Sequence, residues 1–160
     1  MNADCSAWVS DLLAVGPNDV GSGLRTGSDY STPIEARGKG TCRGIDQSRE
    51  MVEQARARNT PGLRSGHVDP RCGSVESLPF DDSSFDKALA INSMQVWPDA
   101  VAGLREIWRV MKPGGKIALG FTPYAGQPNR GFEATLIAAG FTKAQVVETG
   151  KAFCVLAKKP

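Results

Sequence analysis

The chain has 160 residues, of which 41% are hydrophobic and 22% charged, and its formal net charge is +2. This length suits one domain of ordinary size, and the composition is close to the average for soluble globular domains. The small net charge argues against a nucleic-acid or anionic membrane partner. No apolar run suits a transmembrane helix, and residues 1–10 do not resemble a signal peptide. We therefore expect a single cytoplasmic domain over residues 1–160, with no nucleic-acid or membrane partner.

The cysteines and the histidine offer little material for metal or nucleophilic chemistry. The four cysteines are far apart and form no CxxC pair, so a zinc site is not expected. His67 is the only histidine, which leaves little for a Ser/His/Asp triad. We expect reduced thiols and no metal.

Strand-like and helix-like stretches alternate from Ile45 onward, the pattern of an α/β sheet. A strand is expected to end at Asp46, followed by a helix over residues 48–59 and a weak strand over residues 66–72. Pro70 cannot donate a ladder hydrogen bond, so this weak strand belongs at a sheet edge.

The second half of the chain carries clearer signals. Residues 86–92 contain a continuous apolar run, as in a strand covered on both faces. Residues 101–111 place apolar side chains at helical spacing. A strand, a short helix and two hairpin strands are expected at residues 116–121, 131–139, 145–148 and 152–157. The sequence thus predicts an α/β fold, a mostly parallel twisted sheet with helices on both faces and an antiparallel C-terminal hairpin.

A glycine-rich stretch, DVGSG at residues 19–23, precedes this regular part of the chain. A glycine turn lets the backbone approach a ligand closely, because no Cβ intrudes. Asp46 follows about 23 residues later, near the usual spacing of an acidic residue that accepts ribose hydroxyls. We therefore expect Asp19, Gly21, Gly23 and Asp46 to bind a nucleoside cofactor.

Three sequence blocks resemble one protein family when taken together. They are DQS at residues 46–48, LPFDDSSFD at residues 78–86 and LREIWRVMKPGG at residues 104–115. In this order they resemble the class I S-adenosylmethionine-dependent methyltransferases that act on small molecules, the type 11-like methyltransferase domains. The resemblance covers roughly residue 44 to the C-terminus. It implies a Rossmann-like fold, S-adenosyl-L-methionine as cofactor and a small-molecule methyl acceptor as partner.

The resemblance also implies which residues bind the adenosine part of the cofactor. Asp46 would bind the ribose, and Gln47 and Met51 would flank the adenine. Ser74 and Val75 would line the adenine pocket, although the family usually has an aspartate where this chain has Ser74. A serine hydroxyl accepts a hydrogen bond more weakly than an ionised carboxylate.

The remaining implied residues lie around the reacting methyl group. Asn92 would lie near the methionine part of the cofactor, and Gln95 and Trp97 would face the substrate. Core packing is the alternative for both Met51 and Trp97. Methyl transfer from a sulfonium depends mainly on positioning the acceptor, so no catalytic residue is assigned.

Residues 20–43 depart from the family pattern, in which an apolar strand ends in an acidic residue before the glycine turn. Residues 16–19 run almost directly into the glycines, which leaves no room for that strand; a strand at residues 12–15 is the alternative. We expect this atypical segment to be poorly ordered and cofactor binding to be weak. Because its length fits while its residues do not, we hypothesise a local slip of the reading frame.

Two other functions fit parts of the sequence. The atypical segment fits a degenerate methyltransferase fold that binds little or no cofactor, and a cofactor titration would separate this from an active enzyme. The glycines and Asp46 fit a nicotinamide-dependent oxidoreductase, but the blocks at residues 78–86 and 104–115 do not.

Overall fold

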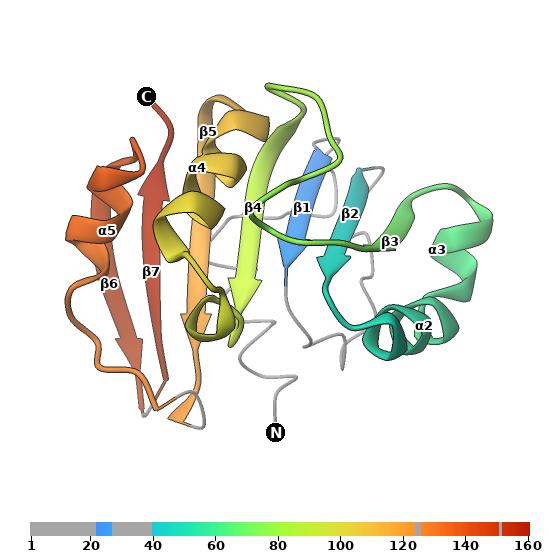
Figure 1. Cartoon of the computed structure of the whole chain (residues 1–160), viewed down its shortest axis with the longest axis horizontal. Coiled ribbons are helices and arrows are strands. Elements are labelled where there is room, and N and C mark those ends of the chain that lie inside the picture. The colour runs from blue at the N-terminus through green and yellow to red at the C-terminus, as the bar shows by residue number, and fades with distance from the viewer. Residues whose placement is uncertain (1–21, 27–39, 124–125, 151) are drawn as a thin grey trace.

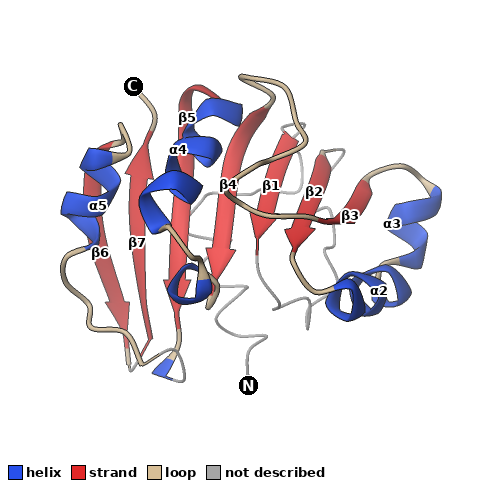
Figure 2. Ribbon diagram, viewed as in Figure 1, coloured by secondary structure: helices blue, strands red, loops and turns tan. Residues whose placement is uncertain are grey.

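The computed structural model describes residues 22–26, 40–123, 126–150 and 152–160. Within these residues, seven strands form one sheet in the order β3-β2-β1-β4-β5-β7-β6 (Figure 1). The strands are β1 (Ser22–Thr26), β2 (Thr41–Asp46), β3 (Val68–Cys72), β4 (Phe85–Ile91), β5 (Met111–Phe121), β6 (Thr142–Thr149) and β7 (Ala152–Lys158). The helices are α2 (Arg49–Arg58), α3 (Thr60–Arg64), α4 (Ala100–Val110) and α5 (Phe132–Ala138), with a 3-10 helix, η1 (Met94–Val96) (Figure 2). None of the described helices is long and apolar enough to cross a membrane.

The pairing of the strands confirms the predicted sheet. β1 pairs in parallel with β2 and β4, and β2–β3 and β4–β5 are parallel as well. β7 pairs antiparallel with β5 and β6. β3 lies at the sheet edge, as Pro70 predicts. The guanidinium of Arg56 donates to the Pro70 carbonyl at 3.1 and 3.3 Å, which occupies part of this exposed edge.

Strand β1 corrects the prediction that the first strand is missing. Ser22–Thr26 occupies the centre of the sheet, where Leu24 is 1% exposed. The segment has one large apolar side chain, so its pattern does not predict a strand. Parallel partners on both sides supply the hydrogen bonds and the burial that override weak local preference. The alternative strand at residues 12–15 lies outside the described residues.

The position of β1 also corrects the predicted glycine turn. Gly23 does not follow a strand but lies inside one, paired with Cys42 and Lys87. Asp19 and Gly21 lie outside the described residues and precede β1 in the chain. The prediction treated these residues as the turn after a strand because two glycines in three residues usually mark a turn.

Helix α2 begins as predicted, with the Ser48 hydroxyl accepting the Met51 N–H at 3.3 Å. The predicted end at residue 59 is confirmed, because α2 ends at Arg58 with Asn59 as its C-cap. Pro61 and Gly62 lie in the short helix α3 that follows. Proline is tolerated in the first turn of a helix, because its missing N–H has no partner there. α2 and α3 pack against β3.

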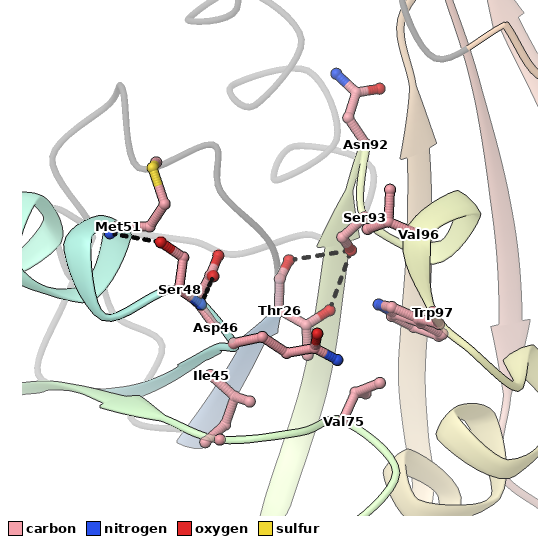
Figure 3. Close-up of a pocket in the computed structure, with 12 residues that line it drawn as sticks. Thr26, Ile45, Asp46, Ser48, Met51, Val75, Asn92, Ser93, Val96 and Trp97 are labelled. Carbon is pink, nitrogen blue, oxygen red and sulfur yellow. Dashed lines mark hydrogen bonds between the residues drawn. The ribbon is translucent and has the colours of Figure 1, made fainter.

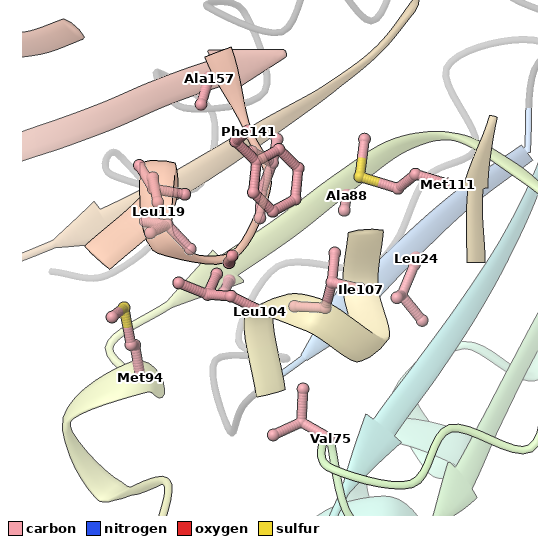
Figure 4. Close-up of a cluster of buried hydrophobic side chains, with 14 of the residues drawn as sticks. Leu24, Val75, Ala88, Met94, Leu104, Ile107, Met111, Leu119, Phe141 and Ala157 are labelled. Carbon is pink, nitrogen blue, oxygen red and sulfur yellow. The ribbon is translucent and has the colours of Figure 1, made fainter. Parts of the chain in front are cut away.

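Helix α4 buries its apolar side as the spacing predicts (Figure 4). The Asp99 carboxylate caps its first turn by accepting the Ala102 N–H at 2.9 Å. Leu104 and Val110 are fully buried and Ile107 is 1% exposed. α5 packs beside α4 and against β6 and β7, so the main core lies between these two helices and the sheet.

Candidate functional site

A pocket of about 190 Å³ opens where β1, β2, β3 and β4 reach their carboxyl ends (Figure 3). Open α/β sheets bind ligands at this edge. Thr26 and Asp46 end β1 and β2, and Gly73 and Asn92 directly follow β3 and β4. The described residues that line the pocket are Thr26, Ile45, Asp46, Gln47, Ser48, Met51, Gly73, Val75, Asn92, Ser93, Val96 and Trp97.

One side of the pocket is formed by the end of β2 and the first turn of α2. The Asp46 carboxylate accepts the Ser48 N–H at 2.7 Å through one oxygen, which orients the group. An ionised carboxylate has about four acceptor sites, so Asp46 can accept ribose hydroxyls in addition. Asp46, Gln47 and Met51 all line the pocket, so the structure brings together three residues that the sequence predicts.

The opposite side is apolar and consists of Val75, Val96 and Trp97 (Figure 3). Val75 is buried, whereas Val96 is 71% exposed at the pocket. Trp97 lines the pocket and also packs against the hydrophobic core; that it faces the substrate stays a prediction. The Glu76 carboxylate accepts the Asp99 N–H at 2.8 Å, which ties together the two loops that carry this wall.

Thr26 and Ser93 lie between these two sides (Figure 3). Both side chains are buried, and their hydroxyl oxygens are 3.4 Å apart. The Ser93 hydroxyl also donates to the Thr26 carbonyl at 3.4 Å. Thr26 is the last residue of β1, so a neutral hydroxyl stands at the end of this strand.

Asn92 is held in a fixed orientation by the neighbouring strand end. Its backbone is left-handed, with φ of 46°, a conformation that asparagine tolerates better than most residues. Its amide nitrogen donates to the Thr122 hydroxyl at 2.9 Å, and its amide oxygen accepts the Thr122 N–H at 2.9 Å. This reciprocal pair joins the ends of β4 and β5 and presents Asn92 to the pocket.

Three predicted site residues that the structure describes do not line the pocket: Gly23, which lies inside β1, Ser74 and Gln95. The Ser74 hydroxyl accepts the Glu76 N–H at 3.2 Å and so shapes its own loop, while Gly73 lines the pocket next to it. Gln95 lies in η1, and its amide oxygen is buried without a hydrogen-bond partner. The roles proposed for Ser74 and Gln95 stay predictions.

Six lining residues were missed by sequence reasoning; five of them lie within two residues of the end of a strand, and Val96 lies in η1. The missed residues are Thr26, Ile45, Ser48, Gly73, Ser93 and Val96. The general rule that ligands bind at the carboxyl ends of parallel strands could have found the residues at β2, β3 and β4. It could not have found Thr26, because β1 itself was not predicted.

A pair of charged residues on α4 holds the loop that follows Val75. Arg109 donates to the carbonyls of Leu78 and Phe80 at 3.1 and 3.0 Å. Glu106 accepts the Leu78 N–H at 2.9 Å and the Arg109 Nε–H at 2.8 Å. The hydrogen bond from Arg109 lowers the pKa of Glu106 below its ordinary value of 4.5, although burial acts in the opposite direction. The loop is thereby fixed to α4 before any ligand binds.

The electrostatic character of the pocket is simple. Asp46 is the only ionisable side chain among the described lining residues. One carboxylate on one side and an apolar wall on the other fit a nucleoside, whose ribose hydroxyls donate and whose base has large apolar faces. The geometry and the fold together define a nucleoside-binding α/β domain of the class I methyltransferase type.

The comparison with protein families agrees with this class. A family model described as "Methyltransferase domain" matches residues 18–119. The chain belongs to this methyltransferase family and is an S-adenosylmethionine-dependent enzyme.

Several relatives of known sequence are similar over most of the chain. The putative methyltransferase YrhH of Bacillus subtilis (strain 168) is 26% identical over 151 residues, which cover 93% of this chain and 83% of YrhH. The uncharacterized methyltransferase YdaC of the same organism is 32% identical over 130 residues, 73% of this chain and 69% of YdaC. The ubiquinone/menaquinone biosynthesis C-methyltransferase UbiE of Geobacter sp. (strain M21) is 38% identical over 107 residues, 67% of this chain but 42% of UbiE.

Solved structures share the fold at lower identity. A SAM-dependent methyltransferase from Aquifex aeolicus superposes with a TM-score of 0.79 at 22% identity, covering 92% of this chain and 87% of that one. The [4+2]-cyclase SpnF also has a TM-score of 0.79, at 19% identity, covering 97% of this chain and 80% of SpnF. These similarities show the fold alone.

Proposed function

We propose that this chain transfers a methyl group from S-adenosylmethionine to a small, uncharged molecule with an apolar part. The observation that carries this proposal is the contrast between the two sides of the pocket. Asp46, on the side of β2 and α2, is the only ionisable side chain among the described residues that line the pocket. Asn92, Val96 and Trp97, on the side of β4, offer one amide and apolar surface. Burying a charged acceptor there would be costly without a partner of opposite charge.

The chain's own residues act by positioning. When bound, S-adenosylmethionine supplies a sulfonium-activated methyl group. Asp46 holds the ribose, Val75 and Trp97 exclude water beside the base, and Val96 lies on the acceptor side. The Asn92–Thr122 pair keeps the end of β4 rigid, so that the acceptor meets the methyl group in one orientation. Orientation of this kind can lower a barrier by about 7 kcal/mol or more.

The relatives support the acceptor class. UbiE of Geobacter sp. (strain M21) is described as a ubiquinone/menaquinone biosynthesis C-methyltransferase, and quinone rings are uncharged and largely apolar. We propose a class of methyl acceptor, a neutral ring or chain compound, and not a particular quinone. A cytoplasmic location and the absence of a nucleic-acid partner stay predictions.

The proposal is tested with S-adenosylmethionine carrying a labelled methyl group and acceptors that differ in charge. We expect neutral phenols or quinols to be methylated, and their carboxylate or ammonium analogues to react at least about tenfold more slowly, because an unpaired charge is costly to bury. Preference for the charged analogues would contradict the proposal.

A charge placed at the wall tests the same idea from the protein side. Val96 is 71% exposed, so Val96→Asp should fold normally. It should lower kcat/KM for a neutral acceptor while leaving S-adenosylhomocysteine affinity unchanged. Ile137→Asp is the matched control, because Ile137 is 64% exposed on α5 and does not line the pocket. Equal activity of the two variants would contradict the assignment of Val96 to the acceptor side.

A further inference from the structure

Gly103 occupies an unusual place, the buried face of α4. Apart from proline, glycine is the least favourable residue in a helix interior, because it loses the most backbone freedom on folding. The backbone at Gly103 is regular, since its N–H donates to the Asp99 carbonyl at 3.0 Å, and no left-handed φ requires glycine there. The reason for glycine must therefore lie in packing.

Two side chains fill the space that a larger residue at position 103 would need. A Cβ on Gly103 would lie 2.9 Å from Cε3 of Trp97 and 3.1 Å from Cγ1 of Val75. The first separation is closer than real Cβ contacts, and the second requires the neighbour to move by a few tenths of an ångström. Both neighbours line the pocket, so the wall of the pocket rests directly on the bare backbone of α4.

The wall cannot relax freely in other directions. Val75 is 3% exposed, and Leu104, the next residue of the helix, is fully buried. The bond from the Asp99 N–H to the Glu76 carboxylate joins the two wall segments at 2.8 Å. Since interiors are closely packed, an added methyl group behind the wall displaces it toward the open side. That open side is the pocket.

We propose that Gly103 is a positioning residue for the cofactor, because its missing side chain lets Trp97 and Val75 sit back against α4 and sets the width of the nucleoside pocket. This inference rests on the proposed function in one respect, namely that the pocket takes the nucleoside part of S-adenosylmethionine. Gly103 itself is not among the residues that line the pocket, so it acts through Trp97 and Val75.

The test is a calorimetric titration of S-adenosylhomocysteine into the wild type and into Gly103→Ala, together with thermal unfolding of both proteins. We expect Gly103→Ala to remain folded and its affinity to fall by about tenfold, the size expected for a methyl group forced into a packed site. Gly62→Ala is the matched control. Its Cβ would lie 2.6 Å from Cγ2 of Val68, an even more crowded place that does not line the pocket, and its affinity should stay at the wild-type value.

Combining Gly103→Ala with Trp97→Ala distinguishes a positioning role from a general disturbance of the fold. In Trp97→Ala the ring is absent, so adding Gly103→Ala should change the affinity by less than about threefold, because the added Cβ then no longer meets the Trp97 ring. Tryptophan fluorescence should also differ between Gly103→Ala and the wild type, and not between Gly62→Ala and the wild type.

Each outcome decides the matter. A folded Gly103→Ala that binds like the wild type would overturn the inference alone. So would a Gly103→Ala that does not fold, or an affinity loss that Gly62→Ala shares, because the added methyl group would then disturb the fold and not the pocket. A folded wild type that does not bind S-adenosylhomocysteine would overturn the proposed function and this inference together.

Discussion

Asp46 accepts a hydrogen bond from the Ser48 N–H at 2.7 Å, and Ser48 in turn caps α2. The carboxylate is therefore oriented by the same turn that starts the helix. A side chain held in this way loses little freedom when it binds a ligand, which favours affinity. Asp46 is also the only ionisable side chain among the described lining residues. We therefore expect it to make the largest single contribution to cofactor binding.

Asp46→Asn isolates the charge, because an amide oxygen can still accept the Ser48 N–H. We expect the affinity for S-adenosylhomocysteine to fall by about tenfold or more, since hydrogen bonds to charged groups contribute about 1.5–3 kcal/mol. Asp46→Ala should lose more, including some stability from the turn. The control is Asp69→Asn, which removes a charge paired with Arg71 on β3. Calorimetry that gave the two asparagine variants equal affinity would refute the role of Asp46.

At the residue scale, the sequence motifs predicted those pocket residues that lie within the motifs themselves. Asp46, Met51, Val75, Asn92 and Trp97 were named from sequence blocks, and all line the pocket. Gln95 was named from the same blocks but does not line the pocket. It lies in the 3-10 helix η1, whose tight turn points neighbouring side chains in different directions.

At the scale of elements, α4 connects the core to the pocket. Its buried side fills the space above the sheet, Glu106 and Arg109 fix the loop after Val75, and Gly103 supports the wall. These contacts lie within three turns of one helix, so the stability of α4 and the shape of the pocket are coupled.

Leu104→Ala tests the core role of α4. Leu104 is fully buried, so we expect the free energy of unfolding to fall by about 2–5 kcal/mol, as in other large-to-small core changes. Denaturant unfolding measures the loss. A change below about 1 kcal/mol, typical of surface positions, would show that the helix does not belong to the main core.

The Glu106–Arg109 pair predicts a dependence of stability on pH. The pKa of Glu106 is lower in the folded protein than its ordinary value of 4.5. Above pH 4.5 the carboxylate is ionised in both states and its stabilising effect is complete. As the pH falls through the folded pKa, the unfolded state binds its proton first and the effect is lost.

Glu106→Gln should therefore be less stable than the wild type by about 1–2 kcal/mol at neutral pH. The difference should shrink as the pH falls below 4.5. Unfolding of both proteins measured over pH 3–7 checks this, an interval chosen around ordinary carboxyl pKa values of roughly 4. A difference that stays constant over the interval would show that Glu106 acts without its charge.

Strand β1 marks the limit of sequence reasoning about elements. β4, α4 and the C-terminal pair β6–β7 carry strong periodic signals and were predicted within a few residues. β1 has Leu24 as its one large apolar residue, and its other four residues are polar, charged or glycine. Its strand conformation comes from β2 and β4 on either side, information that no local window contains.

At the scale of the whole molecule, β1 fills the place of the strand that the sequence analysis considered missing. The predicted loss of a central strand would have left two unpaired edges, and the structure has none there. Within residues 20–43, Ser22–Thr26 and the start of β2 at Thr41 are strands, while residues 20, 21 and 27–39 lie outside the described part; poor order of this segment stays a prediction. Weak cofactor binding and the slip of the reading frame stay hypotheses.

The fold by itself does not decide the reaction. A [4+2]-cyclase and a SAM-dependent methyltransferase superpose on this chain equally well, in keeping with the rule that function lies in sites grafted onto shared folds. The family match and the arrangement of Asp46, Asn92 and the apolar wall are what favour methyl transfer.

The most direct test of the account is a calorimetric titration of S-adenosylhomocysteine into the folded wild-type protein, with Asp46→Asn alongside. The account predicts saturable binding at one site per chain, weakened by about tenfold or more in the variant. Absence of saturable binding, or equal affinity of the two folded proteins, would contradict the claim that this pocket is the cofactor site.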